Sequence, residues 1–109
     1  VPGSCLYLWM RGGGARLRGA HGEAQGLLER AESGAASMPA LQAIIRNDLF
    51  WTSLSRLDLP GALSALSPLL DAEKTTPYHS VYAYETAVLL LCLGRGGEAA
   101  GMLARVDAF

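Results

Sequence analysis

Charge is scarce in this chain. Asp, Glu, Lys and Arg make up 17% of its 109 residues, and the formal net charge is −1. A protein that binds nucleic acid or an anionic membrane through electrostatics needs a basic patch or a basic excess. The basic residues are scattered, except for a small local group at Arg11, Arg16 and Arg18 that is typical of a solvated surface. We therefore expect no nucleic-acid partner.

Cysteines and long apolar runs are also few. The longest apolar run, residues 87–93, is far shorter than the roughly 20 residues that a transmembrane helix needs. Cys5 and Cys92 are far apart and belong to no C-x-x-C pair, which favours two reduced, buried thiols in a cytoplasmic protein. No secretory signal is visible. Because the chain begins Val-Pro-Gly-Ser rather than with Met, we expect it to be a fragment of a longer protein.

β-Branched residues are few as well, whereas half of the chain is hydrophobic and rich in Ala, Leu and Gly. The apolar content excludes a disordered chain, and the shortage of β-branched residues favours helix over sheet. At 109 residues the chain is long enough for one small core. We therefore predict one all-α domain that spans residues 1–109.

Three segments repeat one pattern. Ala24, Ala62 and Ala99 follow each other at intervals of 38 and 37 residues, and a helix-like stretch ends shortly before each. The other matched positions are Gly19, Leu57 and Gly94 at the helix ends and Leu28, Leu66 and Leu103 four residues after the alanines. A period of a few tens of residues predicts a solenoid of helix pairs, in which each unit buries its apolar face on its neighbours. We expect three antiparallel pairs, at about 4–33, 39–72 and 77–107.

Hydrophobic spacing and proline positions set the expected helix limits. The predicted helices cover residues 6–18, 22–32, 39–57, 60–70, 78–93 and 96–106, with Ser4 capping the first and Pro39 and Pro77 opening the third and fifth. Three consecutive glycines would each cost roughly 1 kcal/mol inside a helix. The segment Gly12–Gly14 is therefore either a weak stretch of helix or a loop, and Pro68 is expected to kink or shorten the fourth helix.

The chain offers one alternative, a nucleotide site. An apolar run followed by Gly94-x-Gly96-x-x-Ala99 is similar to the turn that places a dinucleotide pyrophosphate at a helix N-terminus. That fingerprint needs a preceding strand and an acidic residue about 20 positions later, but the chain ends ten residues after Ala99. The same turn recurs at Gly19 and Leu57 without any phosphate-binding pattern. The alternative is a cofactor-binding enzyme fragment.

No other pattern indicates catalysis or metal binding. His21 and His79 have no Cys or His at ligand spacing, and Glu29 and Glu32 are spaced as neighbours on a solvated helix surface. The glycine triplet is not followed by the G-K-[ST] of a phosphate loop. We therefore predict no enzyme activity, no catalytic residues, no cofactor and no metal.

The segment L-C-L-G-R-G-G-E-A-A-G-M-L resembles the middle of a tetratricopeptide repeat (TPR), with Gly94, Ala99 and Leu103 at the positions that define the turn and the second helix. The period is longer than the usual ~34 residues. The resemblance implies a TPR-like α-solenoid that binds protein partners in a groove lined by the first helix of each pair. It assigns to this groove Leu6, Trp9, Arg16, Ile44, Asn47, Trp51, Ser55, Val81, Tyr84 and Val88.

Three aromatic residues among these, Trp9, Trp51 and Tyr84, lie at comparable points of the three units. Aromatic side chains at helical spacing either pack in a core or anchor a partner, because they bury much area and keep a polar atom. For Trp51 both interpretations remain open. The anchor interpretation predicts a line of contacts along the groove.

Two longer segments show a narrower likeness. L-Q-A-I-I, followed by L-D-L-P-G-A, and Y-A-Y-E-T-A-V-L-L-L-C-L-G-R are similar to the C-terminal repeat region of a subunit of the TRAPP vesicle-tethering complexes. This likeness implies a cytoplasmic scaffold in transport between the endoplasmic reticulum and the Golgi. Its partners would be other subunits of the same multisubunit complex.

Overall fold

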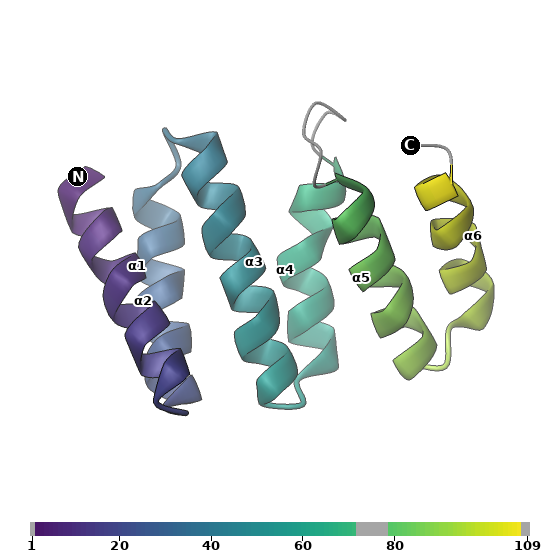
Figure 1. Cartoon of the computed structure of the whole chain (residues 1–109), viewed down its shortest axis with the longest axis horizontal. Helices are drawn as coiled ribbons and strands as arrows, with labels where there is room; N and C mark the ends of the chain where they lie inside the picture. The colour runs from purple at the N-terminus through teal and green to yellow at the C-terminus, as the bar shows by residue number, and fades with distance from the viewer. Residues whose placement is uncertain (1, 72–78, 108–109) are drawn as a thin grey trace.

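The computed structural model describes residues 2–71 and 79–107, and all regular structure within these residues is helical (Figure 1). The helices are α1 (Pro2–Leu17), α2 (His21–Gly34), α3 (Pro39–Ser55), α4 (Leu59–Asp71), α5 (His79–Cys92) and α6 (Gly96–Asp107). The all-α prediction is thus confirmed. The expected opening of the fifth helix at Pro77 and most of the preceding linker lie outside the described residues.

The helices stand side by side in a row and alternate in direction, so that each packs on its neighbours in the chain (Figure 1). Beyond these neighbours, only α1 and α3 also bring their backbones close together within the described residues. The radius of gyration is 14.2 Å, above the roughly 13 Å of a compact domain of this length. The molecule is therefore an elongated row, 40 Å long and 17 Å thick.

The turns that join α1 to α2, α3 to α4 and α5 to α6 share one backbone geometry. Each contains a residue with positive φ, and the next N–H donates to the carbonyl five residues before it, as in a Schellman helix end. The positive-φ residues are Gly19 (80°), Leu57 (59°) and Gly94 (77°). The hydrogen bonds run from Ala20 N to Ala15 O (2.9 Å), from Asp58 N to Ser53 O (2.9 Å) and from Arg95 N to Leu90 O (2.8 Å). The sequence repeat is therefore also a repeat of turn geometry.

The repeated alanines lie where consecutive helices approach closely. Ala24, Ala62 and Ala99 are fully buried or nearly so, as are Leu28 and Leu66. Two of the clusters that form the core are centred on these leucines. The third equivalent leucine, on α6, is 38% exposed, because no further helix of the described part covers that end of the row. The repeat thus builds a core of several buried clusters along the row, and the row is open at the α6 end.

The first helix differs from its prediction. It begins at Pro2, so that Ser4 lies inside the helix and does not cap it, and it continues through the glycine triplet. Gly12 explains why the triplet stays helical: a β-carbon there would lie 2.8 Å from Cγ and Cδ2 of the buried Leu28. The glycine thus lets α1 approach α2 closely.

The structure also bears on the expectations for the two cysteines and for Pro68. Cys5 is buried and its Sγ donates to Ala31 O at 3.2 Å, but Cys92 is exposed, so the prediction of two buried thiols was wrong for the second. Helix α4 runs through Pro68 to Asp71, so Pro68 does not shorten it.

Within the described residues, none of the helices combines the length and the hydropathy that crossing a membrane requires.

Candidate functional site

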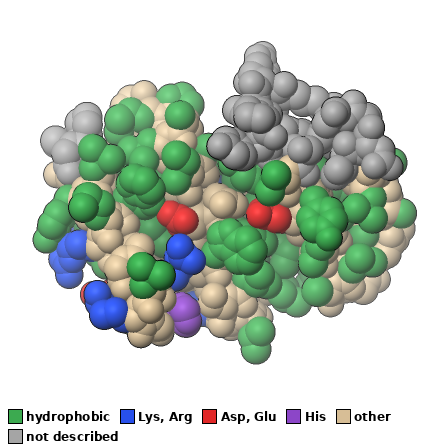
Figure 2. Space-filling model, in the orientation of Figure 1, with side chains coloured by type: hydrophobic (Ala, Val, Ile, Leu, Met, Phe, Trp, Pro, Cys, Tyr) green, Lys and Arg blue, Asp and Glu red, His purple; other side chains and the backbone are tan. Residues whose placement is uncertain are grey.

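The exposed large hydrophobic side chains are concentrated on α1, α3 and α5. They include Leu6, Tyr7, Met10 and Leu17 on α1, Ile44 and Trp51 on α3, and Val81, Tyr84, Val88 and Leu91 on α5. On α3 and α5 their spacing is three, four or seven residues, so each set forms one stripe along its helix. We call the surface formed by Ile44, Trp51, Val81, Tyr84 and Val88 the front face. Figure 2 shows hydrophobic side chains over these two helices, with acidic surface between them and, separately, on the side of α3 that faces α1.

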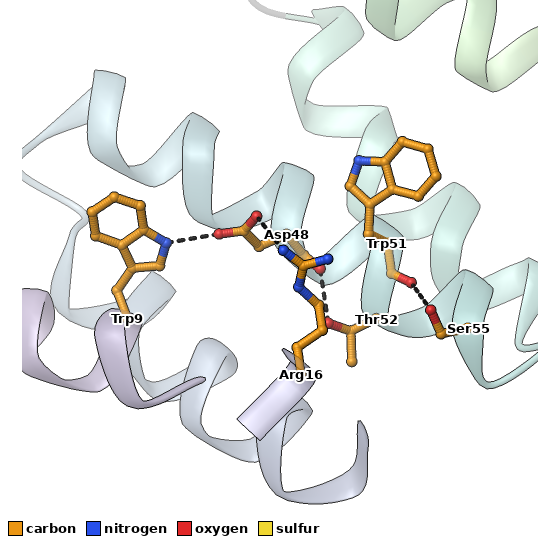
Figure 3. Close-up of polar contacts among 6 residues, drawn as sticks. All are labelled: Trp9, Arg16, Asp48, Trp51, Thr52 and Ser55. Atoms are coloured by element: carbon orange, nitrogen blue, oxygen red, sulfur yellow. Dashed lines mark hydrogen bonds and ion pairs between the residues drawn. The ribbon is translucent and has the colours of Figure 1, made fainter. Parts of the chain in front are cut away.

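Asp48 on α3 holds two side chains of α1 (Figure 3). The indole Nε1 of Trp9 donates to Asp48 Oδ2 at 2.7 Å, and an Arg16 guanidinium nitrogen lies 3.9 Å from Oδ1. The ring of Trp9 also packs against the core cluster that contains Cys5 and Leu28. Two of the predicted groove residues, Trp9 and Arg16, are therefore engaged in joining α1 to α3.

The other predicted groove residues of α3 lie in different environments. Trp51 is 42% exposed, and its ring meets Phe50 edge to face with centroids 4.8 Å apart. Ser55 donates its hydroxyl to Trp51 O at 2.9 Å, a local bond within the helix (Figure 3). Asn47 Oδ1 is buried without a hydrogen-bond partner. Of these residues, Trp51 presents the largest accessible apolar surface.

A cleft of about 290 Å³ separates α3 from α5 on the front face. Its described lining consists of Phe50, Trp51, Leu54, Tyr84, Glu85, Val88, Leu89 and Cys92. The structure therefore brings three of the predicted groove residues, Trp51, Tyr84 and Val88, to one cavity, although they come from two helices. This cleft is the candidate functional site.

Among the described lining residues of the cleft, Glu85 is the only charged one. Glu85 Oε2 is buried and has no hydrogen-bond partner. No Lys, Arg or His stands among the described lining residues to balance its charge. Burial accordingly raises the pKa of the Glu85 carboxyl above its ordinary value. An unpaired carboxylate in an apolar cleft lowers the free energy of unfolding, and pairing with a cation would offset this loss.

We expect Glu85→Gln to raise the melting temperature at pH 7 by a few degrees at most, because it removes an unpaired charge from the cleft. The raised pKa means that the folded chain binds more protons than the unfolded chain, so stability falls as pH rises toward that pKa. The advantage of Glu85→Gln should therefore shrink as the pH is lowered and Glu85 becomes neutral. Thermal unfolding of both proteins between pH 4 and pH 8 checks this; an advantage that is constant over that range would contradict it.

Sequence reasoning missed both acidic residues of this surface. Glu85 is a single charge inside the apolar segment Y-A-Y-E-T-A-V, and that isolation is the one signal that could have drawn attention to it. Asp48 carries no comparable signal, because its partner Trp9 lies 39 residues away in the chain.

The structure also shows the conformation of the segment that formed the alternative nucleotide site. The segment before Gly94 is the helix α5, where the dinucleotide fingerprint requires a strand. Gly94 ends that helix, and the side chains of Arg95 and Glu98 pair with each other across the turn. The described residues bring no three His, Cys, Asp or Glu side chains close enough to hold a metal ion. The geometry thus gives the cofactor interpretation no support.

Comparison of the chain with protein-family models, with curated proteins and with solved structures finds no match. A function is therefore to be inferred from the repeated turn, the front face and the cleft.

Proposed function

We propose that this chain is a protein-binding scaffold, a TPR-like solenoid of three antiparallel helix pairs, and that a segment of a protein partner docks on the front face. The observation that carries the proposal is the distribution of exposed hydrophobic side chains. Most of them lie on the first helix of each pair, the exceptions being Leu57 in a turn and Leu103 on α6, whereas α2 and the described side chains of α4 expose no large hydrophobic residue. Concentrated apolar surface of this kind marks protein interaction sites.

The repeat supports the same proposal. Stacked helix pairs present their first helices side by side on one surface, which is how solenoids form extended binding sites. Trp51 and Tyr84 stand on that surface with 42% and 56% of their area exposed. Aromatic residues of this kind dominate binding energies at protein interfaces.

The narrower likeness gives this proposal a cellular setting. The segments that are similar to the vesicle-tethering subunit include the early part of α3 and most of α5, the helices that form the front face. Under this proposal the chain is a cytoplasmic scaffold in ER–Golgi transport, and its partner is another subunit of the same complex.

Trp51→Ala is expected to weaken partner binding at least tenfold, as truncation of an interface aromatic does when it costs about 1.4 kcal/mol or more. The partner is first captured from cell extract with the wild-type chain and identified, and its affinity for each purified variant is then measured by titration. Because Trp51 is 42% exposed, its removal should lower the melting temperature less than the removal of a fully buried core side chain does.

Leu103→Ala is the matched control, since Leu103 is a similarly exposed hydrophobic residue on α6, away from the front face. It should leave the affinity unchanged. Equal losses for the two variants would mean that the partner does not dock on the front face.

A further inference from the structure

The cleft between α3 and α5 combines three features that together identify a chemical class of ligand. Its described lining is largely apolar, the exposed rings of Trp51 and Tyr84 come from its two helices, and Glu85 is the only charged residue among the described lining residues. At about 290 Å³ the cleft lies at the small end of the roughly 300–1,000 Å³ range of small-molecule pockets. It therefore suits one side chain better than a cofactor.

We infer that the cleft receives a single basic side chain, a lysine or arginine, of the protein partner. The inference rests on the proposed function and adds the chemistry of the contact. The aliphatic part of such a side chain fits apolar walls, and its charged end prefers a carboxylate and aromatic ring faces. All of these groups line the cleft.

Charge complementarity distinguishes this occupant from an apolar one. Glu85 Oε2 lacks any hydrogen-bond partner, so a purely hydrophobic side chain would cover a carboxylate and leave it unpaired. The other carboxylate of α3 and α5 on this side, Asp48, already has Trp9 and Arg16 as partners. Glu85 thus remains the acceptor for an incoming cation.

Cys92 provides a direct test, because it is an exposed thiol that lines the cleft, whereas Cys5 is buried. Cys92 and Glu85 are seven residues apart on α5, which is about 10 Å along the helix. A disulfide-linked aminohexyl group attached to Cys92 can span this distance. A hydroxyhexyl group of the same length is the neutral probe.

The protein is equilibrated with each disulfide and increasing amounts of a reducing thiol, and the labelled fraction is read from the intact mass. We expect the aminohexyl adduct to resist about tenfold more reducing thiol than the hydroxyhexyl adduct, the effect of one charge-assisted contact. Glu85→Gln should abolish this preference. Glu29→Gln, which removes the same charge from the exposed face of α2, should keep it.

The affinity of the purified partner for Glu85→Gln completes the experiment. A loss of about tenfold or more, with the variant at least as heat-stable as the wild-type chain, supports the inference. Absence of an aminohexyl preference overturns it, and so does a preference accompanied by unchanged partner affinity. Neither result decides the proposed function, which is judged separately by Trp51→Ala and Leu103→Ala.

Discussion

Gly12→Val is expected to lower the free energy of unfolding by about 2–3 kcal/mol, because it overpacks a well-filled contact. A β-carbon at this position lies 2.8 Å from two atoms of Leu28, and valine adds two methyl groups beyond it. Leu28 is fully buried and cannot move aside without disturbing the core. The helices α1 and α2 must therefore separate or Leu28 must leave its rotamer. Thermal or denaturant unfolding measures the loss.

Gly13→Ala is the matched control. A β-carbon at Gly13 meets nothing within 4 Å, so this variant should gain roughly 0.5–1 kcal/mol from the higher helix propensity of alanine. In the variant that combines Gly12→Val with Leu28→Ala, the two losses should be less than additive, because the smaller side chain relieves the clash. Equal effects of substitutions at Gly12 and Gly13 would show that α1 does not pack on α2 as described.

The repeated turn could be predicted from the sequence because its causes are local. A glycine ends a helix through the left-handed conformation, and a small residue at a fixed distance lets the next helix pack closely. That argument does not extend to Leu57, where a leucine adopts φ of 59°. There the spacing of the repeat, rather than the residue itself, identified the turn. Asp58 caps the following helix by accepting from Gly61 N at 3.0 Å.

The candidate site was only partly predictable, because burial depends on which helix covers which face. Trp9 and Trp51 hold comparable places in the repeat, yet Trp9 bonds to Asp48 while Trp51 is 42% exposed on the cleft. Local sequence around the two tryptophans does not reveal this difference. Cys92 likewise lies in an apolar segment that resembles a core, but it is exposed and lines the cleft between α3 and α5.

Sequence reasoning left the conformation of the glycine triplet open and overlooked Glu85, for opposite reasons. Helix propensity predicts that the triplet destabilises the helix, because a propensity scale does not include the close packing on α2 that Gly12 permits. Pattern analysis overlooks Glu85, since a single charge on a helix is ordinary until its surroundings are known to be apolar. The roles of Gly12 and Glu85 both depend on tertiary contacts.

Asp48→Ala is expected to destabilise the chain by about 2 kcal/mol, the usual contribution of a hydrogen bond to a charged group. The variant removes the acceptor of the 2.7 Å bond from Trp9 and leaves a half-buried indole N–H without a partner. Asp48 also lies 3.9 Å from Arg16, but that pair is a third exposed at the arginine and should contribute about 1 kcal/mol or less.

A double-mutant cycle separates the two contacts. Trp9→Phe keeps an aromatic ring in the core and removes only the N–H donor with part of the ring, so Trp9→Phe and Asp48→Ala should show a coupling of about 1 kcal/mol or more. Arg16→Gln and Asp48→Ala should couple much less. If the coupling instead lies mainly with Arg16, then the ion pair rather than the indole joins α1 to α3. Trp9 would in that case hold its place through the packing of its ring on the core cluster rather than through its hydrogen bond.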